Sequence, residues 1–132
     1  MISIVIVSHS AKVAEGAVEI ASEMNMGGIK LLAAGGTEDG RVGTSAEKIM
    51  NAITEAYSGD DVLVFADIGS SILSTEMAVE MLDPEVAAHV KLVDAPVVEG
   101  AVIATIQAGI TESAEEIIQA AVDSKTMPKV QG

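Results

Sequence analysis

The stretch ISIVIVSHS, residues 2–10, decides the predicted fold. Its centre, residues 4–7, contains only isoleucine and valine, which is typical of a strand buried on both faces in a parallel sheet covered by helices. The apolar run ends abruptly at Ser8, His9 and Ser10. In such folds ligands bind at the edge of the sheet where the strands end, so we expect His9 to lie at a functional edge.

The rest of the sequence alternates strand-like apolar runs with helical patterns. Three more strands are predicted, at residues 29–36, 61–67 and 89–96. Helices are predicted at residues 11–26, from Thr44 or Ser45 to Tyr57, at residues 69–83, and in two segments between residues 97 and 125. This order predicts an α/β fold with an open, mainly parallel β-sheet and helices on both faces.

Length and composition limit the class of protein. A chain of 132 residues is expected to form one domain, which we assign to residues 1–126, followed by a short polar tail at residues 127–132. Without cysteine, a signal-peptide pattern or an apolar run of ~18 residues, a cytoplasmic protein is expected. The formal net charge of −13 argues against binding to nucleic acid or membranes and favours basic protein partners, although an acidic surface that only maintains solubility is the simpler interpretation.

Two polar residues are expected to meet at the functional edge. In flavodoxin-like sheets the first and third strands lie side by side where the strand order reverses, which would bring His9 and Asp67 into contact. A carboxylate that accepts a hydrogen bond from one imidazole nitrogen fixes the tautomer and leaves the other nitrogen with a free lone pair. His9 would then be an oriented nucleophile or base.

Small and hydroxyl-bearing residues surround this pair in the sequence. The backbone N–H groups of Gly69, Ser70 and Ser71, at the start of a predicted helix, are expected to be unpaired and to bind phosphate. Ser10 is a further candidate phosphate ligand. Alternatively, Asp67 and Ser70 or Ser71 only cap the helix, and position alone does not decide between these interpretations.

Four segments of the sequence, taken together, resemble a known family. They are VSHS at residues 7–10, a Gly-Thr pair before a helix at residues 43–44, DIGSSILSTE at residues 67–76 and APVVEG at residues 95–100. In this order and spacing they are similar to mannose-family enzyme IIA domains, in particular the phosphotransferase subunits of phosphoenolpyruvate-dependent dihydroxyacetone kinases. The resemblance covers about residues 1–110, and no motif is matched beyond Gly109.

This resemblance implies a role for each central residue. His9 would be the phosphorylated histidine, taking a phosphoryl group from the phosphocarrier protein HPr and passing it to ADP bound on another kinase subunit. Asp67 falls at the position of the family's histidine-orienting aspartate. The chain would thus be a homodimeric phosphotransferase that uses no metal and no cofactor beyond its covalent phosphohistidine. Delivery of phosphate to a sugar-specific transporter domain is the alternative.

Other sites are less well supported by the sequence. The chain has two histidines and no cysteine, which argues against a structural zinc site, and it has no nucleotide-binding glycine-rich motif. A hydrolase could use Ser70, His9 and Asp67, but the sequence lacks the G-x-S-x-G motif expected around the nucleophilic serine of such an enzyme. A response-regulator-like protein, phosphorylated on Asp67, would need an acidic cluster to bind magnesium after the first strand, where this chain has His9. A binding module without phosphorylation, in which His9 only packs, is also considered.

Two expectations concern the remaining candidate residues. His89 opens the fourth predicted strand, so we place it at the opposite edge of the sheet, roughly 20 Å from His9, as a surface or packing residue. Leu73, Met77 and Met81 share one helical stripe, which predicts a contribution to the core. If Ile72 or Leu73 lies at the rim of the His9 site instead, it could help to receive HPr.

Overall fold

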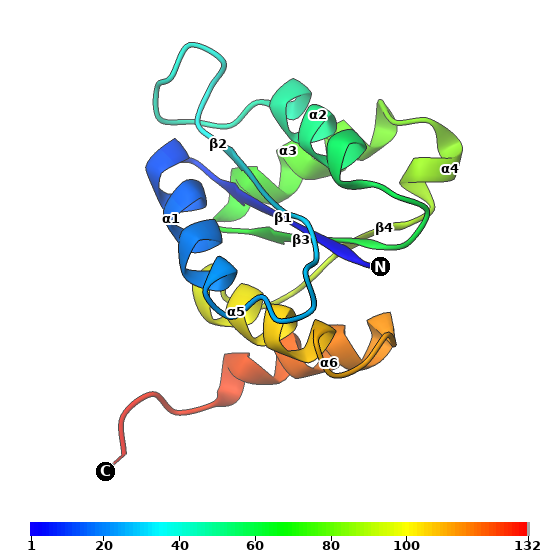
Figure 1. Cartoon of the computed structure of the whole chain (residues 1–132). Helices are drawn as coiled ribbons and strands as arrows, with labels where there is room; N and C mark the ends of the chain where they lie inside the picture. The colour runs from blue at the N-terminus through cyan, green and yellow to red at the C-terminus, as the bar shows by residue number, and fades with distance from the viewer. Residues whose placement is uncertain (132) are drawn as a thin grey trace.

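Four parallel strands form a single sheet in the order β2-β1-β3-β4 (Figure 1). This computed structural model describes residues 1–131, so that Gly132, the last residue of the predicted tail, lies outside the described residues. The strands are β1 (Ser3–Ser8), β2 (Leu31–Gly35), β3 (Val62–Ala66) and β4 (Val90–Leu92). The predicted α/β fold and the predicted pairing of the first and third strands are confirmed.

Helices cover both faces of the sheet (Figure 1). Along β1, Ile4 and Ile6 point to the face covered by α1 (Ala11–Ser22) and α5 (Val97–Ala108), with α6 (Ala114–Asp123) packed beyond α5. Val5 and Val7 point to the opposite face, covered by α2 (Ala46–Ala56) and α3 (Gly69–Glu80). All four of these β1 side chains are completely buried, which explains why this strand contains only isoleucine and valine at its centre.

The first helix and the fourth strand end earlier than predicted. The first helix ends at Ser22 and not near residue 26, because the Asn25 side chain bonds both the backbone N–H and the carbonyl oxygen of Ile29 and holds the chain in a non-helical connection. The fourth strand covers only Val90–Leu92 and not residues 89–96. Here Ala95 N–H donates to the Val93 carbonyl at 3.0 Å, which turns the chain away from the sheet.

Serine residues begin three of the helices, and Ser45 is one of the two residues predicted to start the second of them. Ser10, Ser45 and Ser113 each accept a hydrogen bond from the backbone N–H three residues later, at the starts of α1, α2 and α6. The third long helix ends at Glu80 rather than near residue 83, and a short helix, α4 (Pro84–Ala87), follows it. Proline at the first position of α4 fits the helix start, which needs no N–H there.

The prediction that Leu73, Met77 and Met81 belong to the core is wrong. Their exposed fractions are 62%, 58% and 51%. The face of α3 that packs on the sheet carries the small residues Ser71, Thr75 and Ala78 instead. The Thr75 hydroxyl donates to the Ser71 carbonyl within the helix at 2.7 Å, so it is buried without losing a hydrogen bond. Small side chains bring α3 close to the sheet and leave its large apolar side chains outside.

The C-terminal part ends on α6 and a short 3-10 helix, Ser124–Thr126. Beyond it, Lys129 Nζ lies 2.7 Å from Glu99 Oε2 of α5, so the segment predicted as a tail still contacts the domain. Among residues 1–131, none of the helices combines the length and the apolar character that crossing a membrane requires.

Candidate functional site

Parallel pairing of β1 with β3 brings His9 and Asp67 together. Val7 pairs with Ala66, and Asp67 N–H donates to the Val7 carbonyl at 3.1 Å, so both strands end at the same level. His9 Nδ1 then lies 3.0 Å from Asp67 Oδ1. The predicted contact between these two side chains is confirmed, and both remain partly exposed.

Asp67 is surrounded by hydrogen-bond donors. Oδ2 accepts from the Ser8 hydroxyl at 2.7 Å and from His9 N–H at 3.1 Å, while Oδ1 accepts from Ile68 N–H at 2.8 Å and from the Ser71 hydroxyl at 2.5 Å. Burial alone raises the pKa of this carboxyl group, but the bonds from Ser71, Ser8 and His9 outweigh that effect. The pKa of Asp67 therefore lies well below its ordinary range, and the side chain is an anion at neutral pH.

The anionic Asp67 determines which ring nitrogen of His9 carries the proton. Nδ1 faces the carboxylate, so it carries the ring proton and donates it, which leaves a lone pair on Nε2. The Ser70 hydroxyl lies 2.5 Å from Nε2 and donates to that lone pair. His9 thus has one nitrogen fixed from inside the protein and one nitrogen with a lone pair that faces outward, at the exposed first turn of α3.

Not all of the backbone N–H groups predicted to be unpaired at Gly69, Ser70 and Ser71 lack an acceptor. Gly69 and Ser70 lie in the first turn of α3, where helix geometry provides no acceptor for the backbone N–H groups. The prediction is wrong for the backbone of Ser71, whose N–H donates to the Ile68 carbonyl at 2.8 Å. Ser71 acts through its hydroxyl, on Asp67 and His9 Nδ1. Ser10 caps α1 through its side-chain oxygen, which Val13 N–H reaches at 3.3 Å.

Ser8 is a member of the site that the sequence analysis did not single out. Its side chain is 1% exposed, donates to Asp67 Oδ2 and accepts from Ser10 N–H at 3.1 Å. A serine at the end of an otherwise apolar buried strand was the available signal, because buried hydroxyl groups almost always have a hydrogen-bond partner. Ser8 connects the carboxylate to the backbone that enters α1.

A second loop is tied to the backbone of His9. Gly43 N–H donates to the His9 carbonyl at 2.8 Å, and Gly43 has a φ of 145°, which favours glycine at this position. The next residue, Thr44, shares a hydrogen bond of 2.6 Å with Ser74 of α3. The Gly-Thr pair before α2 therefore fixes the loop after β2 against both the histidine and the helix that carries Ser70.

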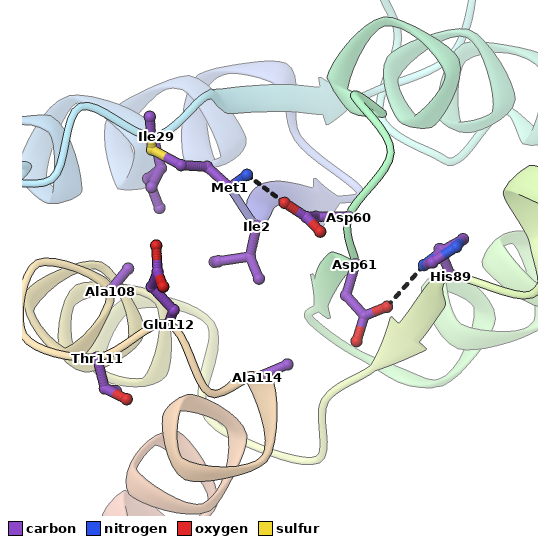
Figure 2. Close-up of a pocket in the computed structure, with 10 residues that line it drawn as sticks. All are labelled: Met1, Ile2, Ile29, Asp60, Asp61, His89, Ala108, Thr111, Glu112 and Ala114. Carbon is purple, nitrogen blue, oxygen red and sulfur yellow. Dashed lines mark hydrogen bonds and ion pairs between the residues drawn. The ribbon is translucent and has the colours of Figure 1, made fainter.

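The second histidine lies at the opposite end of the sheet, as predicted. His89 precedes β4, its Nδ1 is 3.0 Å from Asp61 Oδ1, and its ring packs against that of Tyr57. It lines a cavity of about 350 Å³. Asp60 also lines this cavity, and its carboxylate pairs with the N-terminal amine (Figure 2). Since Asp60, Asp61 and Glu112 line this cavity, it is unsuited to phosphate groups.

The parallel sheet and the histidine at its carboxyl edge define an α/β domain with an oriented imidazole. A family model described as the PTS system fructose IIA component, EIIA-man, matches residues 3–118. The chain belongs to this family of phosphotransferase-system components. A crystal structure of a protein of unknown function, EF1359, has a TM-score of 0.82 at 39% identity, covering 92% of this chain and 93% of that one.

Curated relatives carry a consistent description. The phosphoryl donor subunit DhaM of phosphoenolpyruvate-dependent dihydroxyacetone kinase 2 from Listeria innocua is 44% identical over 119 residues, which cover 90% of this chain and 95% of that protein. The phosphotransferase subunit DhaM from Lactococcus lactis is 39% identical, covering 82% of this chain and 85% of that protein. The DhaM subunit from Klebsiella michiganensis is 42% identical over 99% of this chain, which spans only 28% of that longer protein.

Proposed function

We propose that this chain is a phosphohistidine carrier and a phosphotransferase: it accepts a phosphoryl group from phospho-HPr on His9 and passes it to ADP held by another subunit of dihydroxyacetone kinase. The observation that carries the proposal is the His9–Asp67 contact of 3.0 Å, which leaves Nε2 facing outward with a lone pair. The names of the relatives from Listeria innocua and Lactococcus lactis support the kinase as the acceptor system.

The proposed transfer proceeds through a covalent bond to Nε2. The Ser70 hydroxyl rotates away and the Nε2 lone pair attacks phosphorus, while the bond from phosphorus to the donor nitrogen breaks and that nitrogen keeps the electron pair. The proton on Nδ1 stays with the ring, and the Asp67 carboxylate stabilises the positive charge that develops there. The hydroxyl of Ser70 and the backbone N–H groups of Gly69 and Ser70 would hold the phosphoryl oxygens.

In the second transfer, an oxygen of the terminal phosphate of ADP attacks phosphorus and Nε2 recovers its lone pair. The acidic chain has no evident way of binding a free nucleotide, so the acceptor must arrive on a protein that neutralises its charge. The phosphoryl group is carried covalently, without a cofactor or metal of this chain. The family resemblance extends the proposal to a homodimer.

Charging of His9 tests the first transfer. The chain is incubated with phosphoenolpyruvate, enzyme I and HPr, and its intact mass is measured at alkaline pH, where phosphohistidine is stable. We expect one phosphoryl group, which peptide mapping assigns to His9. Phosphate on Asp67, His89 or a serine, or no incorporation at all, contradicts the proposal.

Discharge of phospho-His9 tests the second transfer and a second candidate function. The description of the matching family as a sugar-system component favours delivery to a sugar-specific transporter domain as the alternative. We expect phospho-His9 to be stable to free ADP with magnesium and to lose its phosphate when the ADP-loaded kinase subunit is added. Discharge only by the transporter domain assigns the alternative function.

Ser70, His9 and Asp67 are also arranged like the serine, histidine and aspartate of a hydrolase triad. Ser70 Oγ is 2.5 Å from His9 Nε2, and Nδ1 is 3.0 Å from Asp67 Oδ1. A serine hydrolase would lose its activity and its labelling by a fluorophosphonate in the Ser70→Ala variant. For a carrier we expect no labelling of the wild type, and His9 remains chargeable in Ser70→Ala.

A further inference from the structure

Two helices of this domain, α3 and α5, carry apolar residues on their outer sides as well as on their inner sides, but only the outer side of α5 is covered by another helix. α5 packs its small residues Gly100, Ala101 and Ala104 on the sheet side, and its outer side is covered by α6, which places Ile117 in the same core. α3 packs Ser71, Thr75 and Ala78 inward and carries large apolar residues outward. Within residues 1–131, no element covers this outer side of α3 as α6 covers α5. Exposed large apolar side chains that cluster on one side of a helix, with polar residues beside them, are typical of an interaction site.

The outer side of α3 forms a defined apolar surface. Leu73, Met77 and Met81 follow one another at intervals of four residues, so their side chains are neighbours along the helix. Ile68 and Ile72, which are 67% and 40% exposed, stand at its N-terminal end. We refer to these five residues as the α3 outer face.

This face begins at the reactive nitrogen of His9. Ser70, whose hydroxyl contacts Nε2, stands in the first turn of α3 between Ile68 and Ile72. Any protein that brings a reacting atom in line with Nε2 must therefore approach this end of the helix. A partner that extends along the helix from there would cover Leu73 and then Met77.

Charge on the same helix selects the kind of partner. Glu76 and Glu80 are exposed among the apolar residues, and the whole chain has a net charge of −13. A second copy packed on this face would bring like charges together, whereas a partner with lysine or arginine beside its apolar patch would be attracted. Two methionines in the face suit a surface that must release its partner and adapt to another.

We propose that the α3 outer face is the docking surface for the nucleotide-bearing acceptor protein, which meets it with an apolar patch flanked by basic side chains. This inference rests on the proposed function, because it assumes that phospho-His9 is discharged to a protein-bound nucleotide. The apolar contact gives affinity, and Glu76 and Glu80 orient the partner so that its nucleotide faces Nε2.

The test uses the full chain with substitutions at exposed positions. Leu73→Glu and Met77→Glu remove apolar contact, and the double variant Glu76→Lys, Glu80→Lys reverses the charge. Ile20→Glu is the matched control, since Ile20 is also helical and 49% exposed but lies near the C-terminal end of α1, away from His9. Each variant is first charged with the small-molecule donor phosphoramidate, which needs no docking, and its discharge is then measured against the concentration of the ADP-loaded kinase subunit.

We expect equal charging by phosphoramidate in all variants. The KM for the kinase subunit should rise about tenfold or more in each α3 variant, with kcat nearly unchanged, while Ile20→Glu behaves as the wild type. An unchanged KM in Leu73→Glu and Met77→Glu overturns the inference, and so does a shift of their sedimentation from dimer to monomer at unchanged KM, which would assign the face to a second copy. Failure of the wild type to be discharged by the kinase subunit would contradict the proposed function itself.

Discussion

The two ends of the sheet each carry a histidine–aspartate pair with the same contact distance. His9 Nδ1 lies 3.0 Å from Asp67 Oδ1 at the carboxyl end, and His89 Nδ1 lies 3.0 Å from Asp61 Oδ1 at the amino end. What differs is the surroundings of each pair. Asp67 also accepts bonds from two hydroxyls and two backbone N–H groups, whereas His89 packs on the ring of Tyr57. His89 also borders an acidic cavity (Figure 2).

This difference indicates what a histidine needs in order to carry phosphate. At both ends of the sheet, the contact with the aspartate is enough to fix the orientation of the imidazole ring. Only at the carboxyl end is the second ring nitrogen next to the N-terminus of a long helix, where backbone N–H groups favour an anion. At the amino end the neighbouring carboxylates of Asp60 and Glu112 would repel a phosphoryl group.

The largest expected effect comes from removing either imidazole. His9→Gln should reduce phosphate incorporation from phospho-HPr to background, because the attacking nitrogen is absent. His89→Gln should be charged at the wild-type rate, since its ring lies at the opposite end of the sheet. Incorporation is measured by intact mass at alkaline pH. Loss of charging in a folded His89→Gln protein would contradict the distinction between the two pairs.

The aspartates should differ strongly as well. Asp67→Asn places an amide beside Nδ1, which favours the tautomer with the proton on Nε2, so the nitrogen that must attack loses its lone pair. We expect charging to slow by about 10²-fold to 10⁴-fold. Rapid-quench measurements give the rate, and ¹⁵N shifts of the His9 ring report the tautomer. Asp61→Asn is the control, and equal slowing in both variants would assign Asp67 a purely structural role.

A smaller effect is expected at Ser8. Ser8→Ala removes a hydrogen bond to a partly buried carboxylate, which should lower the free energy of unfolding by about 1–3 kcal/mol and raise the pKa of Asp67. Urea unfolding and an NMR titration of the Asp67 carboxyl group measure the two quantities. Ser3→Ala is the matched control, because Ser3 is a buried serine at the other end of the same strand. An unchanged Asp67 pKa in Ser8→Ala would remove Ser8 from the site.

The most gradual effect concerns pH. The pKa of Asp67 is lower in the folded chain than its ordinary value of 3.8, so the unfolded chain binds more protons in acid. The stabilisation from the ionised carboxylate is therefore fully present above that ordinary value and is lost as pH falls through the folded pKa. In unfolding experiments between about pH 7 and about pH 3, the difference between wild type and Asp67→Asn should shrink towards acid. A difference that stays constant would show that Asp67 does not stabilise the fold through its charge.

The sequence by itself determined the fold class, the pairing of the first and third strands and the contact of His9 with Asp67. These features depend on short-range signals: a strand of isoleucine and valine, capping serines, and polar residues directly after strands. In a parallel α/β sheet the ends of neighbouring strands must meet at one edge, so a position in the sequence becomes a position in space. The two helices predicted after residue 97 are confirmed for the same reason, because their caps and breaks are local.

Only the tertiary structure decided which side of α3 is buried and which donors surround Asp67. A helix with apolar residues on all sides has no periodicity that shows its inner face, and here small residues such as Ser71 and Thr75 pack inward because they allow close approach to the sheet. Ser8 bonds to Asp67 although the two residues are 59 positions apart in the sequence. Ser71 bonds to Asp67 through its hydroxyl, while its backbone N–H donates to the Ile68 carbonyl. Such contacts depend on how complete elements pack, which short-range patterns in the sequence do not specify.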